Sequence, residues 1–173
     1  SFRPLYDLYK LLNMQKSNLT TLCYLEQDGK YLMLHRTKKE HDINKDKWLG
    51  IGGHFENTEA PEECLQREML EECGVTLEDP KLRGVITFVS DLYGCEYMFL
   101  YTATKYNGKL FSSCNEGELE WIKKEDVYNL PLWTGDKIFF KLLESRIDFF
   151  SLKLCYSGDD LIKAVLDGKE LSF

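Results

Sequence analysis

The sequence lacks any run approaching the roughly 18 consecutive apolar residues that a membrane-spanning helix needs. It also lacks a basic excess, since 22 Lys and Arg stand against 29 Asp and Glu, for a formal net charge of −7. A protein of this charge is a poor candidate for binding a nucleic acid polymer through its phosphates. We therefore expect no membrane and no nucleic acid partner. An anionic substrate would need a local cation to offset its charge.

Cysteine and histidine follow no metal-binding pattern. The six cysteines form no C-x-x-C pair, and none lies at zinc-ligand spacing from one of the three histidines. A chain of this length has no need of disulfides to stabilise its fold. We expect free thiols and a cytoplasmic protein.

The length of 173 residues and the hydrophobic fraction of 43% fit one folded domain. We place this domain at residues 18–173. The segment 1–17 lacks the basic start and cleavage site of a secretory signal. Two interpretations of it stay open: a short native helix, or upstream sequence ahead of a natural start at Met14.

Apolar runs and turn residues predict strands mixed with two helices. Asp28-Gly29 is a tight-turn signal and predicts a hairpin between the first two strands. The stretch 35–47 is polar and aperiodic, which predicts a surface loop, whereas the glycines of 48–55 indicate a backbone that approaches another segment closely. The expected strands are 20–25, 31–34, 82–89, 96–103, 119–122 and 149–156, and the expected helices are 61–73 and 135–144. No regular βαβ alternation is present, which favours an α+β fold.

The predicted helix 61–73 carries the chemistry. Glu68, Glu71 and Glu72 stand at i, i+3 and i+4, so their carboxylates share one face. A solvated acidic surface is one interpretation of this face. A site for Mg²⁺, which takes oxygen ligands, is the other.

The spacing of the surrounding residues decides between these interpretations. The fixed positions, spread over the 23 residues from Gly53 to Val75, are Gly53, Glu59, Arg67, Glu68, Met69, Glu71, Glu72, Gly74 and Val75. This pattern resembles the Nudix box, and the chain resembles the Nudix hydrolase family. The resemblance implies an α+β fold of the Nudix type, an α/β/α sandwich with a mixed β-sheet. It also implies hydrolysis of a phosphoanhydride bond in a nucleoside diphosphate derivative, with Mg²⁺ or alternatively Mn²⁺ as cofactor.

The resemblance assigns roles to the residues that match the box. It makes Glu68 and Glu72 metal ligands and catalytic residues, often joined by Glu71, and adds the backbone carbonyl of Gly52. Four further positions, Gly53, Glu59, Arg67 and Gly74, support the site. A last acidic ligand comes from a downstream loop, where Glu116, Glu118 and Glu120 compete. We choose Glu116 because it lies five residues before Trp121, as in mutator-type members.

Beyond the box, the resemblance runs from about Asn18 to the C-terminus and favours the MutT-like oxidised-purine nucleoside triphosphatases. These enzymes include the 8-oxo-dGTP diphosphatases, which sanitise nucleotide pools and so protect DNA. Trp133 matches a tryptophan near the purine, and Asp136 matches one of two acidic residues that read its edge. Gly135 and Leu49 depart from the pattern, because they replace the other Asp and a base-reading Asn.

Two further residues are expected at the substrate. Phe88 is expected to complete the base pocket, and Arg36, at the end of a strand, to contact a phosphate, with core packing and a plain surface charge as the respective alternatives. No histidine lies in the helix motif, so we expect no covalent mechanism.

The expected reaction is conversion of a nucleoside triphosphate, such as 8-oxo-dGTP, to monophosphate and pyrophosphate. ADP-ribose, a dinucleoside polyphosphate or a pterin triphosphate remain alternative substrates, and a non-catalytic nucleotide-binding domain is a third interpretation. Whether the protein is a monomer or a homodimer stays open.

Overall fold

The computed structural model describes residues 18–173, so the segment 1–17 and its two interpretations lie outside the described residues. The helices are α2 (Pro61–Cys73), α3 (Asp136–Ser145) and a short 3₁₀ helix, η1 (Val127–Asn129). The strands are β1 (Asn18–Gln27), β2 (Lys30–Arg36), β3 (Trp48–Leu49), β4 (Val75–Glu78), β5 (Lys81–Ser90), β6 (Gly94–Ala103), β7 (Lys105–Gly108), β8 (Ser113–Cys114), β9 (Gly117–Lys123), β10 (Phe150–Ser157), β11 (Asp160–Leu166) and β12 (Lys169–Glu170). None of the described helices is both long and apolar enough to cross a bilayer.

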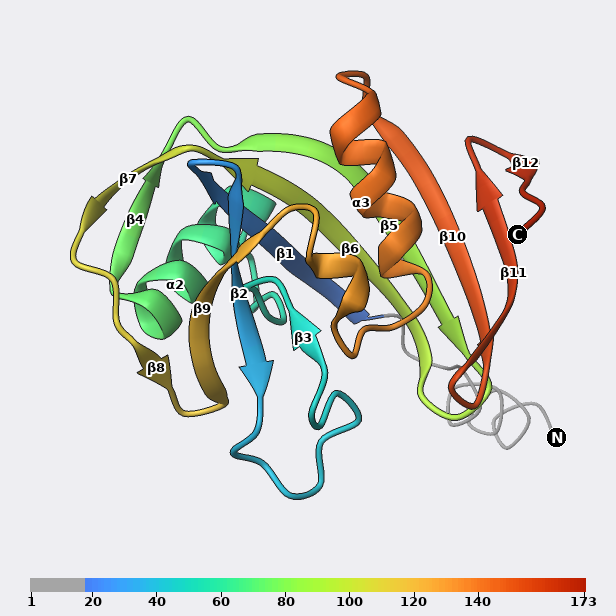
Figure 1. The fold of residues 1–173 in the computed structure, drawn as a ribbon, viewed down its shortest axis with the longest axis horizontal. Coiled ribbons are helices and arrows are strands. Elements are labelled where there is room, and N and C mark those ends of the chain that lie inside the picture. Colours follow the sequence, from blue (N-terminus) through green and yellow to red (C-terminus); the bar gives the residue numbers. More distant parts are fainter. Residues whose placement is uncertain (1–17) are drawn as a thin grey trace, which may run out of the picture.

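Within residues 18–173 one ten-stranded sheet runs in the order β12-β11-β10-β5-β6-β1-β2-β9-β8, and β3 pairs with β2 (Figure 1). β1 is parallel to β6 and β10 is parallel to β5, whereas the other pairs are antiparallel. A separate ribbon joins β4 to β7. The sheet is therefore mixed, as predicted.

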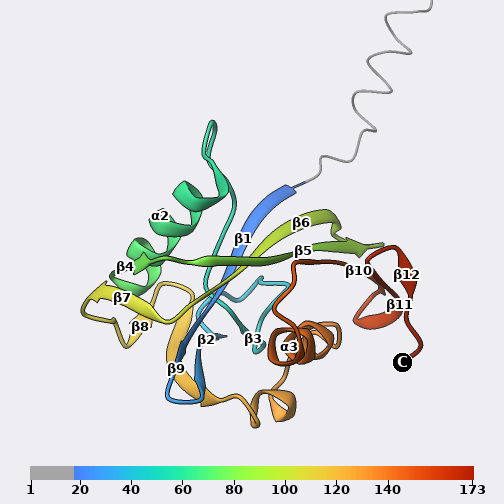
Figure 2. The ribbon, with the colours of Figure 1, turned by 90° about the horizontal axis from the view of Figure 1, so that it is seen from above.

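The two helices cover opposite sides of the sheet (Figure 2). Side chains alternate between the faces of a strand. In β1, Tyr24 enters the core that packs against α3, whereas Cys23 and Leu25 enter the core that packs against α2. This arrangement of two cores in an α/β/α sandwich confirms the predicted fold class.

The glycine-rich segment after β3 lies against the first half of β1. β2 pairs with β1 only at Glu26–Gln27, and farther back along β1 the loop takes its place. Thr21 donates its N–H to the Gly53 carbonyl at 3.0 Å, and Ile51 donates to Cys23 at 2.9 Å. A Cβ on Gly52 would lie 1.8 Å from the Thr21 carbonyl oxygen. The predicted close backbone approach is confirmed, and it fixes the loop that precedes α2.

Helix α2 ends as its sequence predicts. Gly74 adopts the left-handed conformation, with φ of 76°, and donates its N–H to the Leu70 carbonyl. At the other end Ala60 gives no side-chain cap, and the Glu63 carboxylate accepts the Ala60 N–H at 3.0 Å instead. Both ends of the acidic helix are therefore defined by hydrogen bonds.

The two helices lie within one residue of their predicted bounds. Two expectations about strands were wrong. His35 and Arg36 continue strand β2 and do not belong to the polar loop, because they pair with the segment Gly117–Glu118 of β9. Five strands were not predicted: β4, β7, β8 and β12 have four residues or fewer, and β11 is rich in apolar residues although only one of its seven residues is buried.

Candidate active site

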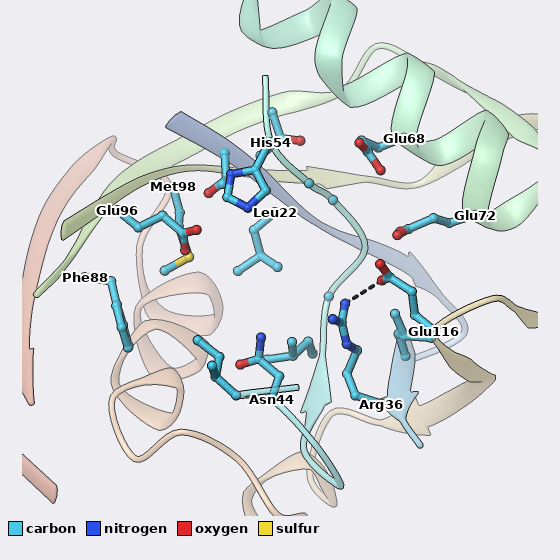
Figure 3. Close-up of a pocket in the computed structure, with 18 of the residues that line it drawn as sticks. Leu22, Arg36, Asn44, His54, Glu68, Glu72, Phe88, Glu96, Met98 and Glu116 are labelled. Carbon is cyan, nitrogen blue, oxygen red and sulfur yellow. Dashed lines mark hydrogen bonds and ion pairs between the residues drawn. The ribbon is translucent and has the colours of Figure 1, made fainter. Parts of the chain in front are cut away.

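One cavity of about 590 Å³ lies between the glycine-rich loop, the second half of α2 and the polar loop after β2 (Figure 3). Carboxylates and arginines gather at one end, whereas the other end is lined by apolar and aromatic side chains with a few polar groups. The residues that carry the argument are Arg36, Asn44, Leu49, Gly52, Gly53, Glu68, Glu72, Phe88, Glu96, Met98, Glu116, Trp133 and Asp136. The cavity therefore brings together most of the predicted site residues.

The three glutamates of α2 are placed unequally. Glu68 and Glu72 line the cavity, and the Glu72 side chain is buried. Glu71 does not line it, and its side chain remains 58% exposed while its carboxylate accepts a bond from Arg67. The three carboxylates were predicted to share one helix face, but only two of them point into the cavity and the third lies outside it.

Arg67 holds the acidic helix to the preceding loop. Its Nε and Nη2 donate to the two carboxylate oxygens of Glu59 at 2.6 and 3.0 Å, and Nη2 also reaches the His54 carbonyl at 2.9 Å. Its Nη1 donates to Glu68 at 2.7 Å. The Arg67 guanidinium lowers the pKa of the Glu59 carboxyl to about 2. This geometry fits the predicted support role of both residues, because one fork-shaped cation fixes the loop, the helix and a cavity carboxylate together.

Glu116 enters the cavity from the turn between β8 and β9. Its carboxylate pairs with Arg36, and Lys39 lies 3.3 Å from its other oxygen. The Arg36 Nε donates to Asp42 at 2.7 Å, so two carboxylates already bind this guanidinium. Of the three candidates in this segment, Glu116 is the one that lines the cavity. Arg36 therefore orients Glu116, a role that the predicted phosphate contact did not include.

Glu72 is the unusual group of the site. Its Oε2 is buried and has no hydrogen-bond partner among the described residues. Burial, followed by the nearby Glu116 carboxylate, raises the pKa of Glu72 well above its usual range. Burying a carboxylate oxygen without a hydrogen-bond partner costs free energy unless a cation binds it or a proton neutralises it.

The donors around Glu72 fit a hard cation. They are carboxylate oxygens from Glu68, Glu72 and Glu116, and the Gly52 carbonyl, to which no described residue donates a hydrogen bond. Oxygen donors of this kind suit Mg²⁺ and Mn²⁺. In the described part of the chain no three carboxylate, histidine or cysteine groups lie close enough together to hold a metal ion. Arginines bind two of the cavity carboxylates, Glu68 and Glu116.

Gly53 has a steric reason to lack a side chain. A Cβ at this position would lie 2.6 Å from the Glu68 carboxylate. The glycine therefore lets the loop pass directly over the acidic helix, so that Glu68 and the loop backbone share one wall of the cavity.

The far end of the cavity contains the predicted base-binding residues. Phe88 and Trp133 line it and meet edge to face, with ring centroids 5.3 Å apart, and Leu49 and Asp136 line it beside them. Trp133 is only 5% exposed, so it belongs to the core and to the cavity wall at once. Burial raises the pKa of Asp136 to about 8.

The structure explains one departure from the pattern of the oxidised-purine enzymes that the sequence resembles. Gly135 donates its N–H to the Tyr156 hydroxyl at 2.7 Å, and a Cβ on it would lie 2.5 Å from Leu154. No second acidic side chain fits at this position without displacing the tyrosine.

Sequence reasoning missed several residues of this end, among them Asn44, Glu96 and Met98. Glu96 and Met98 stand at i and i+2 of β6, and this period of two could have placed them on one face. Asn44 lies in the aperiodic polar loop, where no sequence pattern indicates which side chains turn inward. Its amide oxygen accepts the Trp133 indole N–H at 2.7 Å.

Comparison with known proteins identifies the fold and the box together. Residues 16–143 match the NUDIX domain. The chain belongs to the Nudix hydrolase family. An uncharacterized Nudix hydrolase of Bacillus subtilis, YvcI, is 34% identical over 120 residues, which cover 67% of this chain and 72% of that protein. The predicted family, the α+β fold and the assignment as an enzyme are thereby confirmed.

Two further similarities bear on the type of Nudix hydrolase. An oxidized purine nucleoside triphosphate hydrolase of Danio rerio is 28% identical over 160 residues, which cover 91% of this chain and 99% of that protein. Among solved structures, the MutT protein from Bacillus halodurans matches with a TM-score of 0.77 and 28% identity, covering 88% of this chain and 99% of that chain.

Proposed function

We propose that this Nudix hydrolase converts a purine nucleoside triphosphate, of the oxidised 8-oxo-dGTP kind, to the monophosphate and pyrophosphate. The observation that carries the proposal is one continuous cavity, which has carboxylate and carbonyl oxygens at one end and an aromatic pocket with a buried carboxyl at the other. A triphosphate is long and anionic, whereas a purine is flat and edged with hydrogen-bonding groups. The two ends of the cavity differ in the same way.

The acidic end is the proposed site of Mg²⁺, with Mn²⁺ as the alternative. Glu68, Glu72 and Glu116 and the Gly52 carbonyl would hold it, with Glu71 at the rim as a further carboxylate. A divalent cation bound there offsets the charge of the phosphates and makes an attacking water more acidic.

The protein's own residues position this chemistry. Arg67 fixes the direction of Glu68, while Arg36 and Lys39 fix that of Glu116. A carboxylate of this set accepts the proton of the attacking water. The reaction needs no side-chain nucleophile, and we assign no catalytic role to His54, which is exposed at the rim of the cavity.

At the other end, Trp133 and Phe88 offer aromatic surface, and Asp136 offers a carboxyl to the edge of the base. Burial favours the protonated form of Asp136 at neutral pH, so this carboxyl can donate one hydrogen bond and accept another. The similarity to the Danio rerio enzyme supports the same assignment. Removal of oxidised nucleotides before they enter DNA would then be the biological role.

A substrate panel tests the proposal. Release of phosphate and pyrophosphate is measured with MgCl₂ or with EDTA, using 8-oxo-dGTP, dGTP, dATP, dCTP, dTTP, ADP-ribose and a dinucleoside tetraphosphate. We expect metal-dependent release of pyrophosphate, with the highest kcat/KM for 8-oxo-dGTP. Preference for ADP-ribose or the dinucleotide would refute this substrate within the same family, and no turnover of any compound would favour a nucleotide-binding domain.

A further inference from the structure

Asn44 is held against the cavity wall by one defined hydrogen bond. The Trp133 indole nitrogen donates to its Oδ1 at 2.7 Å. An indole N–H can only donate, so the amide oxygen must face the tryptophan. The orientation of this amide, which is ambiguous for many asparagines, is therefore fixed by chemistry.

The other half of the amide faces the cavity. Nδ2 donates to no group among residues 18–173, although Asn44 lines the cavity. Figure 3 shows the Asn44 amide reaching into the space that Leu22, Met98 and Glu96 border from the opposite side. Two N–H donors are thus presented where a base would lie.

The backbone around Asn44 is braced before any ligand binds. Its N–H donates to the Asp42 carboxylate at 3.0 Å, and its carbonyl accepts the Lys47 N–H at 2.9 Å. Asp42 in turn accepts the Arg36 guanidinium at 2.7 Å. The loop is therefore bound to the same arginine that binds Glu116. Because Asn44 is already held in place, ligand binding would cost it little conformational entropy.

Few other groups of the cavity can donate to a base: protonated Asp136 offers one O–H, whereas Asn44 offers two N–H groups. Arg36 and Lys39 are paired with carboxylates. Leu49 offers no hydrogen bond, and Glu96 is an acceptor when ionised. Asn44 is thus a neutral donor of fixed direction in the cavity wall.

We propose that Asn44 is a specificity-determining residue, whose Nδ2 donates to a carbonyl oxygen on the edge of the base. The site would then favour 6-oxopurine nucleotides, the guanine class, over 6-aminopurine nucleotides, because an exocyclic amine facing Nδ2 leaves both donors unpaired. This inference rests on the proposed function in that it needs a purine nucleotide in the cavity.

Asn44→Asp is the discriminating variant. An aspartate keeps an oxygen for the Trp133 N–H and nearly the same shape, but it replaces the two donors with an acceptor. The measurement is the dissociation constant of dGMP, 8-oxo-dGMP and dAMP by calorimetry, without turnover. We expect the wild type to bind both oxopurine nucleotides at least about tenfold more tightly than dAMP. In the variant, the dissociation constants of dGMP and 8-oxo-dGMP should rise at least about tenfold, whereas that of dAMP should change less than about threefold.

Two further variants keep the result interpretable. Asn44→Ala removes the donors without adding charge, so it should weaken dGMP binding comparably, and it replaces the aspartate variant if that variant fails to fold. Asn129→Asp adds the same charge at an exposed position of η1 outside the cavity and should leave all three constants unchanged.

The outcomes separate the two proposals. If the wild type binds dGMP selectively but hydrolyses no nucleoside triphosphate, the proposed function fails and the role of Asn44 stands. If triphosphates are hydrolysed but Asn44→Asp and Asn44→Ala leave the guanine-to-adenine preference unchanged, the role of Asn44 fails alone. A wild type that binds none of the monophosphates, or does not distinguish guanine from adenine, also overturns it.

Discussion

Asp136 makes a quantitative prediction about stability and pH. Its carboxyl is buried at the start of α3, and burial raises its pKa from 3.8 to about 8. In the unfolded chain the carboxyl ionises near pH 4, whereas in the folded chain it stays protonated until about pH 8. The stability that depends on this group is therefore fully present below pH 4 and is lost as the pH rises through 8.

The magnitude follows from the difference in proton binding. Between pH 4 and pH 7 the unfolded chain has released a proton that the native chain retains, which costs about 1.36 kcal/mol per pH unit, or about 4 kcal/mol in all. Asp136→Asn removes the titration with little change of shape. We expect the variant to be more stable by about 4 kcal/mol at pH 7, or about 8 to 16 °C in Tm.

The assay is urea unfolding of wild type and Asp136→Asn at pH 4, 5.5, 7 and 8.5. The difference in unfolding free energy should be smallest at pH 4 and grow with pH. Asp126→Asn, which removes an exposed carboxylate beside η1, is the matched control and should show no such growth. A pH-independent difference between wild type and Asp136→Asn would refute the reasoning, because it would mean that burial does not hold the proton on Asp136.

Three further variants test the acidic end. Glu72→Gln should cut kcat by about 100-fold or more, because it removes a preorganised charge. Without divalent metal the same variant should have a higher unfolding free energy than the wild type, because the carboxyl group it replaces is buried near Glu116. Arg67→Lys should lower the unfolding free energy in urea titrations, because an ammonium cannot form the bidentate hydrogen bonds that the guanidinium donates to Glu59. Gly52→Ala should lower Tm by several degrees or prevent folding, as its Cβ meets the β1 backbone at 1.8 Å; an unchanged Tm would contradict the close approach.

The acidic end could be predicted from sequence because its residues are close along the chain. A helix places residues three and four apart on one face, and the box adds a loop of fixed length before it. These local rules predicted the Gly74 cap, and the family resemblance implied a supporting role for Glu59 and Arg67; the structure contains the cap and joins those two residues by hydrogen bonds. They could not distinguish Glu71 from Glu72, because the depth of a carboxylate depends on the strands packed around the helix.

The base end, and Glu116 of the acidic end, depend on contacts between distant segments. Asn44 meets Trp133 across 89 positions, and Glu116 meets Arg36 across 80. No periodicity in the stretch 35–47 indicates that Asp42 and Asn44 turn inward, since an aperiodic polar stretch is equally typical of a solvated loop. Their direction is set by the Arg36 guanidinium at the end of β2, which becomes visible only once the sheet is assembled.

Arg36 connects the two ends of the cavity physically. It binds Glu116 of the acidic end and Asp42, whose carboxylate also accepts the Asn44 N–H. A change in Glu116 on phosphate or cation binding would therefore alter the charge that Asp42 and Arg36 share, and with it the brace behind Asn44. Hydrogen-bonded groups of this kind couple more strongly than their separate contacts indicate. The loop that sequence reasoning treated as plain surface is thus part of the site.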